Sequence, residues 1–252
     1  TIKRFQKQER QETKTHLHLE HLYQDDNVLI LNKPVGVLSQ KARPDDVSVN
    51  DYVLEVCGQT GKTFRPSICN RLDRNTSGII VSGVSLEGLQ TMAELLKSRE
   101  VHKYYQTIVK GRITEEKKIT GYLKKNEKNN TVEFSKKRTA GSAYIETWYT
   151  PIKVGRDATL LEVWLITGRT HQIRAHLASV GHPVAGDYKY GDRKWNDQLK
   201  QQFGLSSQLL HSARLVFPEK MERCRDLSGR TIIAAKPELF CDIEKTLFDD
   251  KK

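Results

Sequence analysis

Residues 159–166 constrain the fold more than any other segment, because apolar side chains occupy both faces of the strand that they would form. A strand of this kind is buried on both sides, which places it in the middle of a sheet. Residues 101–109 alternate between two faces, and residues 143–149 are rich in aromatic and β-branched side chains, as further strands are. We therefore expect a large sheet, mostly antiparallel, at the centre of the fold.

Three segments with helical signals accompany these strands. Ser48 is a helix-starting residue and Gly58 a helix stop, so the first helix should run between them. Residues 86–96 carry apolar side chains at helical spacing, at Leu86, Leu89, Met92, Ala93 and Leu96. Residues 170–180 should form a third helix that Gly181 closes, with a buried stripe of Ile173, Leu177 and Val180. The expected fold class is α+β, a mixed and mostly antiparallel central sheet flanked by helices and loops.

The charge of the chain points to a polyanionic partner. The formal net charge is +11, and clustered Lys and Arg gain affinity by releasing counterions from phosphates. Residues 117–138 hold eight basic and two acidic side chains, whereas the eight basic and eight acidic residues of 219–252 cancel. The basic segment is either a solvated hairpin or a surface that follows phosphates. Its candidate phosphate contacts are Lys124, Lys125, Lys136 and Lys137.

The spacing of the cysteines and the length of the apolar runs indicate in which cellular compartment the chain works. The four cysteines are Cys57, Cys69, Cys224 and Cys241, and they form no Cys-x-x-Cys pair, so we expect reduced thiols and a cytoplasmic protein. The longest apolar runs, such as residues 28–31, are far shorter than a membrane span. We therefore expect a soluble chain that has no membrane partner.

Several cofactor and metal signatures are missing from the sequence. There is no Gly-x-x-x-x-Gly-Lys phosphate loop, no Gly-x-Gly-x-x-Gly and no Gly-x-Ser-x-Gly. His171 and His176 are five residues apart, so they lie on different helix faces, whereas zinc-binding helices favour a spacing of four. We expect neither a cofactor nor a metal.

Residues 70–78 place one acid, Asp73, among polar neighbours directly before a β-branched run at 79–81. Such a segment is typical of an exposed loop that leads into a buried strand. Side chains alternate in an extended segment, so Arg71 and Asp73 should project to the same side. On loop composition alone, Asp73 is an ordinary salt-bridged or capping carboxylate.

The rest of the chain changes this interpretation. Residues 70–78, Asn-Arg-Leu-Asp-Arg-Asn-Thr-Ser-Gly, resemble the Arg-Leu-Asp-x-x-Thr-Ser-Gly motif of the RluA-type pseudouridine synthases. Further segments resemble motifs of that family in the same order, at residues 29–36, 103–111, 167–174 with 186–191, and 210–215. Ordered motifs are far more specific than one short pattern. One departure is Asn70, where the family usually has His, which affects a supporting contact rather than the acid.

The resemblance implies the pseudouridine synthase fold, catalysis without a cofactor, and roles for particular residues. Asp73 would be the catalytic acid, acting by attack at C1′, by stabilising oxocarbenium character or by taking a proton from C2′. A half-buried guanidinium needs a carboxylate, so Arg174 should pair with a distant acid, and the resemblance implies that this acid is Asp73. Tyr105, on an inward strand face, would stack on the uracil, and Arg71 would fill the space of a flipped nucleotide.

The implied substrate is RNA, with large-subunit ribosomal RNA expected first and transfer RNA second. Arg71, Arg169 and His171 join the hairpin lysines as candidate RNA contacts. Residues 1–20 should be a linker or N-terminal arm, following an S4-type domain if a longer chain has one, and residues 21–252 the catalytic domain of a monomer. Two alternatives stay open: a nucleoside or glycoside hydrolase with Asp73 as nucleophile, although no partner acid is evident, and a non-catalytic RNA-binding protein.

Overall fold

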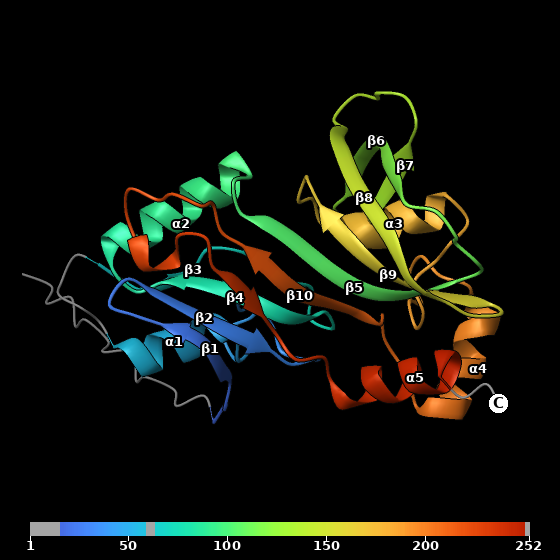
Figure 1. Ribbon diagram of the computed structural model, residues 1–252, viewed down its shortest axis with the longest axis horizontal. Coiled ribbons are helices and arrows are strands. Elements are labelled where there is room, and N and C mark those ends of the chain that lie inside the picture. The colour runs from blue at the N-terminus through green and yellow to red at the C-terminus, as the bar shows by residue number, and fades with distance from the viewer. Residues whose placement is uncertain (1–15, 59–63, 250–252) are drawn as a thin grey trace, which may run out of the picture.

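The computed structural model describes residues 16–58 and 64–249, and most of the expected N-terminal arm, residues 1–15, lies outside them. One long sheet runs through the described part in the order β1-β2-β4-β10-β5-β9-β8-β6-β7 (Figure 1). Its strands are β1 (Glu20–Gln24), β2 (Val28–Lys33), β4 (Ser77–Gly83), β5 (His102–Lys110), β6 (Lys117–Asn126), β7 (Thr131–Ser135), β8 (Ala143–Val154), β9 (Ala158–Leu165) and β10 (Leu210–Val216). Two short strands extend it, β3 (Ser67–Ile68) on β4 and β11 (Thr231–Ile233) on β10.

The expectation of a mixed and mostly antiparallel sheet is confirmed. Each pair of neighbouring strands in the described sheet is antiparallel except β4 and β10, which run parallel. Strand β9 lies between β5 and β8, in the interior position that its two apolar faces predicted. The late strand β10 is inserted between β4 and β5, so the middle of the sheet joins segments that are far apart in sequence.

The helices cover both faces of this sheet. They are α1 (Val49–Cys57), α2 (Leu86–Ser98), α3 (Gln172–Ser179), α4 (Arg193–Phe203) and α5 (Glu238–Phe248), with a short 3-10 turn η1 (Arg225–Leu227). Helix α1 begins as predicted at Ser48, whose hydroxyl accepts from the amide of Asp51 while the Asp51 carboxylate accepts from the amide of Ser48. None of the helices in the described part of the chain is long and apolar enough to cross a membrane.

The apolar core forms on both faces of the sheet. One cluster joins side chains of α1 and α3 to inward residues of the sheet, among them Val53, Tyr105, Val163 and Leu177. Two further clusters lie on the other face, one around Met92 of α2 and one around Phe240 of α5. Full burial of each large apolar side chain contributes about 1.5–3 kcal/mol. Helices α1 and α3 therefore share one face with Tyr105.

The predicted stripe of α2 was partly wrong. Leu86 is 57% exposed and Ala93 is exposed, whereas Gly88, Thr91 and Met92 are buried. A Cβ atom at Gly88 would lie 1.8 Å from the carbonyl oxygen of Asn27, so the helix touches the neighbouring turn through this glycine. This close approach of two backbones rotates the helix away from the orientation that apolar spacing favoured.

The third helix also differs from its prediction. Helix α3 begins at Gln172 rather than at residue 170, because His171 has a left-handed backbone with φ of 54°. Val180 is 38% exposed, whereas the six residues from Gln172 to Leu177 are all buried. The helix packs on β7 and β8 as well as on the main core, so it is buried on more than one side. Its polar side chains are therefore held in the interior.

Buried His176 should make the fold sensitive to acid. Its side chain has no exposed surface, its Nδ1 lies 2.9 Å from Thr147 Oγ1, and burial lowers its pKa to about 4. The unfolded chain binds a proton near pH 6.5, whereas the folded chain does so only near pH 4, so stability is lost as pH falls through this window. We expect a loss of about 3 kcal/mol from this group by pH 4.

Urea unfolding at pH 7 and at pH 4.5 measures this effect in the wild type, in His176→Asn and in the exposed-site control His18→Asn. The control should lose as much stability on acidification as the wild type, while His176→Asn should lose less. Equal losses in all three proteins would show that His176 is not responsible.

Candidate active site

Asp73 lies on a turn that leads directly into β4. The amide of Thr76 donates to the Asp73 carbonyl oxygen at 3.0 Å, which closes the turn. Two residues later Gly78 has φ of 111°, and a Cβ there would lie 2.1 Å from the carbonyl oxygen of Ser212 in β10. Only glycine fits this close approach of β4 to β10. The Asp73 side chain is 26% exposed, so a substrate can reach it.

Lys33 at the end of β2, together with Ser39, holds the backbone of the Asp73 loop. Lys33 is fully buried, and its ammonium donates to three backbone carbonyls, those of Pro34 at 3.0 Å, Val37 at 2.8 Å and Arg74 at 2.9 Å. The Ser39 hydroxyl donates to the Leu72 carbonyl and accepts from its amide. Burial lowers the pKa of Lys33 to about 7, although the nearby charge of Asp73 raises it. The residues on both sides of Asp73 are thus anchored.

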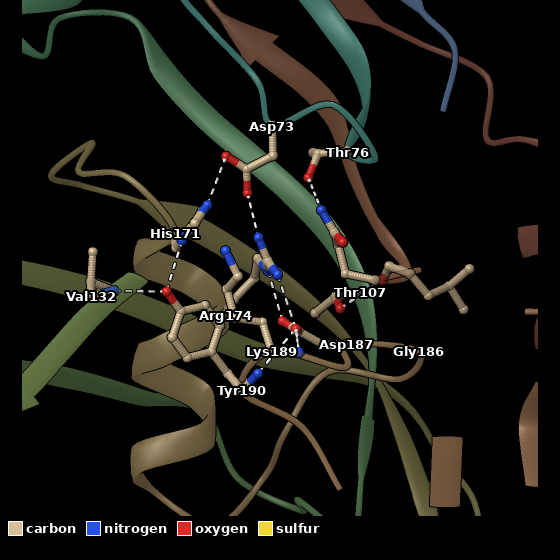
Figure 2. Close-up of polar contacts among 12 residues, drawn as sticks. Asp73, Thr76, Thr107, Val132, His171, Arg174, Gly186, Asp187, Lys189 and Tyr190 are labelled. Atoms are coloured by element: carbon tan, nitrogen blue, oxygen red, sulfur yellow. Dashed lines mark hydrogen bonds and ion pairs between the residues drawn. The ribbon is translucent and has the colours of Figure 1, made fainter. Parts of the chain in front are cut away.

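Arg174 binds two carboxylates at once. Its Nη1 donates to Asp73 Oδ2 at 2.9 Å, while Nε and Nη2 donate to Asp187 at 2.7 and 2.9 Å (Figure 2). Burial lowers the pKa of Arg174, but Asp187 and Asp73 raise it by more, so the guanidinium stays charged. The expected contact between Arg174 and Asp73 is therefore present, and it fixes one oxygen of the half-buried Asp73 carboxylate.

Asp187 is a member of the site that the sequence argument did not identify. It is 1% exposed, and beyond Arg174 its Oδ1 accepts from the amides of Lys189 at 2.9 Å and Tyr190 at 3.2 Å. A carboxylate engaged in this way is not free to act as a general acid or base. The signal was present as Gly186-Asp187 in a segment with family resemblance, where Gly186 has φ of 75°.

Tyr105 lies where its strand pattern predicted, on the inward face of β5. The side chain is 6% exposed and belongs to the same core cluster as Val163. Burial raises the pKa of Tyr105 to about 12, and the nearby charge of Asp73 adds to this effect. The phenol is therefore protonated at neutral pH, and it offers a ring and a hydroxyl rather than a phenolate base.

His171 stands beside Asp73 rather than on an open surface. It is 9% exposed, its Nδ1 lies 2.8 Å from Tyr190 Oη, and its Nε2 lies 3.8 Å from Asp73 Oδ1. The longer distance is that of two facing groups and not of a hydrogen bond. Its expected contact with RNA is limited by this burial, whereas its contact with Asp73 was not anticipated.

The other predicted RNA contacts lie on the exposed surface. Arg71 and Arg169 have exposed side chains, the first in the Asp73 loop and the second just before α3. The four candidate lysines of the hairpin, Lys124, Lys125, Lys136 and Lys137, are also exposed. Lys125 forms an ion pair of 2.7 Å with Glu127. The hairpin of β6 and β7 forms one edge of the sheet and rises beside α3 (Figure 1).

Asn70, the residue that departs from the family pattern, supports β4. Its side-chain amide donates to the carbonyl of Ile79 at 3.2 Å and accepts from the amide of Val81 at 2.8 Å. These contacts hold the backbone of the strand and leave Asp73 untouched. Across residues 16–58 and 64–249, no group of three His, Cys, Asp or Glu side chains could hold a metal ion.

The fold and these contacts define a class of protein. The chain belongs to the RNA pseudouridylate synthase family, whose model matches residues 27–179, well over half of its length. The matched range includes Asp73, Tyr105 and Arg174, although Asp187 lies beyond its end.

Individual relatives carry names for two kinds of RNA. The chain is 34% identical over 207 residues to a ribosomal large subunit pseudouridine synthase C of Vibrio cholerae, covering 79% of this chain and 62% of that relative. It is 32% identical over 212 residues to a tRNA pseudouridine synthase C of Haemophilus ducreyi, covering 80% of this chain and 86% of the relative. Among solved structures, human RNA pseudouridylate synthase domain containing 4 matches 90% of this chain and 92% of its own, with a TM-score of 0.72 and 21% identity, which supports the fold.

Proposed function

We propose that this chain isomerises uridine to pseudouridine in RNA, with Asp73 as the residue that reacts at the sugar. The observation that carries the proposal is the half-buried, accessible Asp73 carboxylate, held at one oxygen by the buried Arg174 at 2.9 Å, on the loop that bears the family motif. Family membership supports the reaction type. The chain spans 62% of the length of the Vibrio cholerae relative. The name of that relative therefore does not establish the activity of this chain, which we propose from its own site.

The reaction needs only groups that this site supplies. The C1′–N1 bond breaks, the uracil turns over, C5 bonds to C1′, and the hydrogen on C5 leaves as a proton, with no net oxidation or reduction. A fixed carboxylate stabilises positive charge that develops at C1′, or forms a bond there, or takes the C2′ proton. Arg174 holds Asp73 Oδ2, so Oδ1 is the oxygen left to do this.

The uracil has to be held without preventing its rotation. We assign the protonated Tyr105 ring to this role, because stacking on an aromatic face holds a base without fixing its orientation, although only 6% of Tyr105 is exposed before RNA binds. Arg71 is exposed and free to move into the space that a flipped nucleotide leaves. We assign these two side chains to base holding and to support of the opened RNA.

The proposed first substrate is a folded segment of large-subunit ribosomal RNA. A flipped uridine costs a few kcal/mol, which specific contacts to a presented loop offset. Transfer RNA is the second candidate, favoured by the Haemophilus ducreyi relative, 86% of which this chain covers.

A hydrolase and a non-catalytic binding protein are weaker alternatives. A glycoside hydrolase uses a second carboxylate as its acid or base. Asp187, which shares Arg174 with Asp73, is buried and engaged by this guanidinium and by two backbone amides. A binding protein would have no need to hold a half-buried carboxylate against a buried guanidinium.

One assay separates these functions, using RNA transcripts that carry tritium at C5 of uridine. Isomerisation releases tritium to water and leaves the RNA chain intact, because C5 becomes the glycosidic carbon. A hydrolase releases labelled free uracil, and a binding protein releases nothing. We expect tritium in water without free base, faster on a ribosomal RNA fragment than on transfer RNA. Free uracil, or no release from any ribosomal or transfer RNA transcript, would contradict the proposal.

The basic hairpin should supply phosphate contacts. Neutralising its four lysines (Lys124, Lys125, Lys136 and Lys137) to Gln should weaken RNA binding and reduce the slope of log K against log salt by about 3, at roughly 0.7–0.9 for each phosphate that is no longer neutralised. The control protein carries four Gln substitutions at exposed lysines elsewhere, at Lys97, Lys200, Lys220 and Lys245. Filter binding over a salt series measures both slopes. A slope equal to that of the wild type would mean that the hairpin is merely solvated.

A further inference from the structure

The two oxygens of Asp73 have different surroundings. Oδ2 accepts a short hydrogen bond from Arg174 Nη1 at 2.9 Å, whereas Oδ1 faces His171 Nε2 at 3.8 Å. Figure 2 shows one contact at each carboxylate oxygen, with the Tyr190 hydroxyl on the side of the imidazole away from Asp73. The nitrogen of His171 is thus directed at the oxygen that the proposed reaction uses.

The hydrogen-bond partners determine where the proton of His171 lies. The amide of Val132 can only donate, and it donates to Tyr190 Oη at 2.8 Å. The single hydroxyl hydrogen of Tyr190 is then left for His171 Nδ1, which lies 2.8 Å from the same oxygen. A neutral imidazole that accepts at Nδ1 carries its hydrogen on Nε2. In this tautomer the Nε2–H group faces Asp73 Oδ1 at an Nε2–Oδ1 distance of 3.8 Å, which is longer than a hydrogen bond.

The surroundings of His171 favour its neutral form. Burial is the main cause that lowers its pKa, and the charges of Arg174 and Lys189 lower it further. The carboxylates of Asp73 and Asp187 oppose this shift without reversing it. The neutral form is the one in which the choice between Nδ1 and Nε2 matters, since an imidazolium would donate from both nitrogens.

The backbone of His171 is held in an uncommon conformation. Its φ of 54° lies in the left-handed region, which is costly for a residue with a Cβ and which Asn adopts more readily than His. Strain of this kind persists where the surrounding structure demands it, often at functional sites. In this conformation His171 precedes α3, makes no side-chain cap to the helix, and reaches Tyr190 and Asp73 instead.

We propose that Tyr190 and His171 are positioning residues for the isomerisation: Tyr190 fixes the tautomer of His171, and the Nε2–H group of His171 orients Oδ1 of Asp73 toward the sugar. This inference rests on the proposed function. It also connects the site to the basic hairpin, because Val132 belongs to β7 and Lys189 Nζ donates to the Asn130 carbonyl at 2.9 Å. The contacts from Val132 through Tyr190 and His171 to Asp73 form a relay that begins in β7. RNA that binds the hairpin therefore contacts the strand in which this relay begins.

Removal of one hydroxyl tests the first half of the relay. Tyr190→Phe keeps the ring but cannot fix the tautomer, so the single-turnover rate should fall about tenfold while the RNA dissociation constant stays unchanged. Tyr188→Phe is the matched control, because Tyr188 is exposed and its hydroxyl donates to Asp197, outside the relay. A Tyr190→Phe rate equal to that of the control would overturn the inference.

Two substitutions of His171 separate positioning from a purely structural role. The amide nitrogen of Gln lies near the place of Nε2, whereas the shorter Asn reaches only the place of Nδ1. His171→Gln should stay within about tenfold of the wild-type rate, and His171→Asn should lose about a hundredfold. A structural role in the left-handed position predicts the opposite order, because Asn tolerates that backbone better. Observation of that opposite order would refute positioning.

A measurement without substrate distinguishes failure of this inference from failure of the proposed function. Nitrogen-15 NMR of the histidine side chains reports the tautomer of each ring, and the signal missing in His171→Gln identifies His171. We expect the Nε2–H tautomer in the wild type and a mixture in Tyr190→Phe. An Nδ1–H tautomer in the wild type would overturn the relay even in an active enzyme. Absence of tritium release from the wild type would contradict the proposed function instead.

Discussion

Asp73→Asn is expected to reduce pseudouridine formation at least about a thousandfold, as the loss of a reacting group does in other enzymes. The amide has the size of the carboxylate but lacks its charge, so it neither stabilises a cation at C1′ nor forms a bond there. RNA affinity should change by less than about twofold, since phosphate contacts dominate binding and lie elsewhere. Tritium release under single-turnover conditions and filter binding measure the two quantities.

The control for this substitution is Asp26→Asn, at an exposed acid in the turn between β1 and β2. It should leave both the rate and the affinity at their wild-type values. Appreciable turnover by purified Asp73→Asn would refute the assignment of Asp73. A large loss of RNA affinity would show instead that Asp73 contributes to binding.

Arg174→Met should abolish activity and also lower the free energy of unfolding by about 3–5 kcal/mol. The loss of stability follows from the geometry, because the substitution leaves Asp187 buried and without its cation, while Asp73 loses the donor to Oδ2. Urea unfolding measures the first effect and tritium release the second. Wild-type values of either quantity would contradict the central position of this guanidinium.

A double substitution separates the two consequences of losing Arg174. Replacing the buried pair by apolar side chains, as in Arg174→Met with Asp187→Leu, should recover much of the stability, because no charge is left unpaired. It should not recover activity, since Asp73 still lacks its donor. Arg174→Lys is the matching conservative variant: it keeps a charge but cannot make three hydrogen bonds in one plane, so its rate should stay low. Recovery of activity in the double variant would mean that Arg174 serves only to neutralise Asp187.

Local sequence pattern was sufficient for the elements that carry the proposed reaction. Alternating side chains placed Tyr105 on an inward strand face, and the β-branched run after residue 78 placed Asp73 in the loop that leads into a buried strand. The need of a buried guanidinium for a carboxylate predicted only that Arg174 has an acidic partner, whereas the family resemblance named Asp73, with which Arg174 is in contact. The strand and loop predictions succeed because the alternation of side chains along a strand is a property of neighbouring residues. The prediction for Arg174 succeeds because a buried charge requires a partner of opposite charge.

The features that the sequence did not reveal depend on contacts between distant segments. The local pattern around Lys33 does not show which carbonyls surround it, and that around Asp187 does not distinguish it from an ordinary turn acid, although its segment resembles a family motif. The orientation of α2 depends on the close approach of Gly88 to Asn27, which apolar spacing does not encode. Apolar spacing predicts a helical backbone at His171. Its left-handed backbone accompanies contacts to Tyr190 and Asp73, which are distant in sequence from the pattern that the prediction used.

The insertion of β10 between β4 and β5 governs when this site can come into existence during synthesis. Ser77 and His211 are 134 residues apart, yet their side chains are hydrogen-bonded at 2.8 Å where the two strands meet. Until β10 has been synthesised, β4 and β5 each have an edge without its final partner strand. The loop of Asp73 is not yet held in a fixed position relative to the strand of Tyr105. A nascent chain is therefore vulnerable to aggregation at these edges between the synthesis of β5 and that of β10. It gains its catalytic geometry in one late, long-range step, of the kind that makes folding slow.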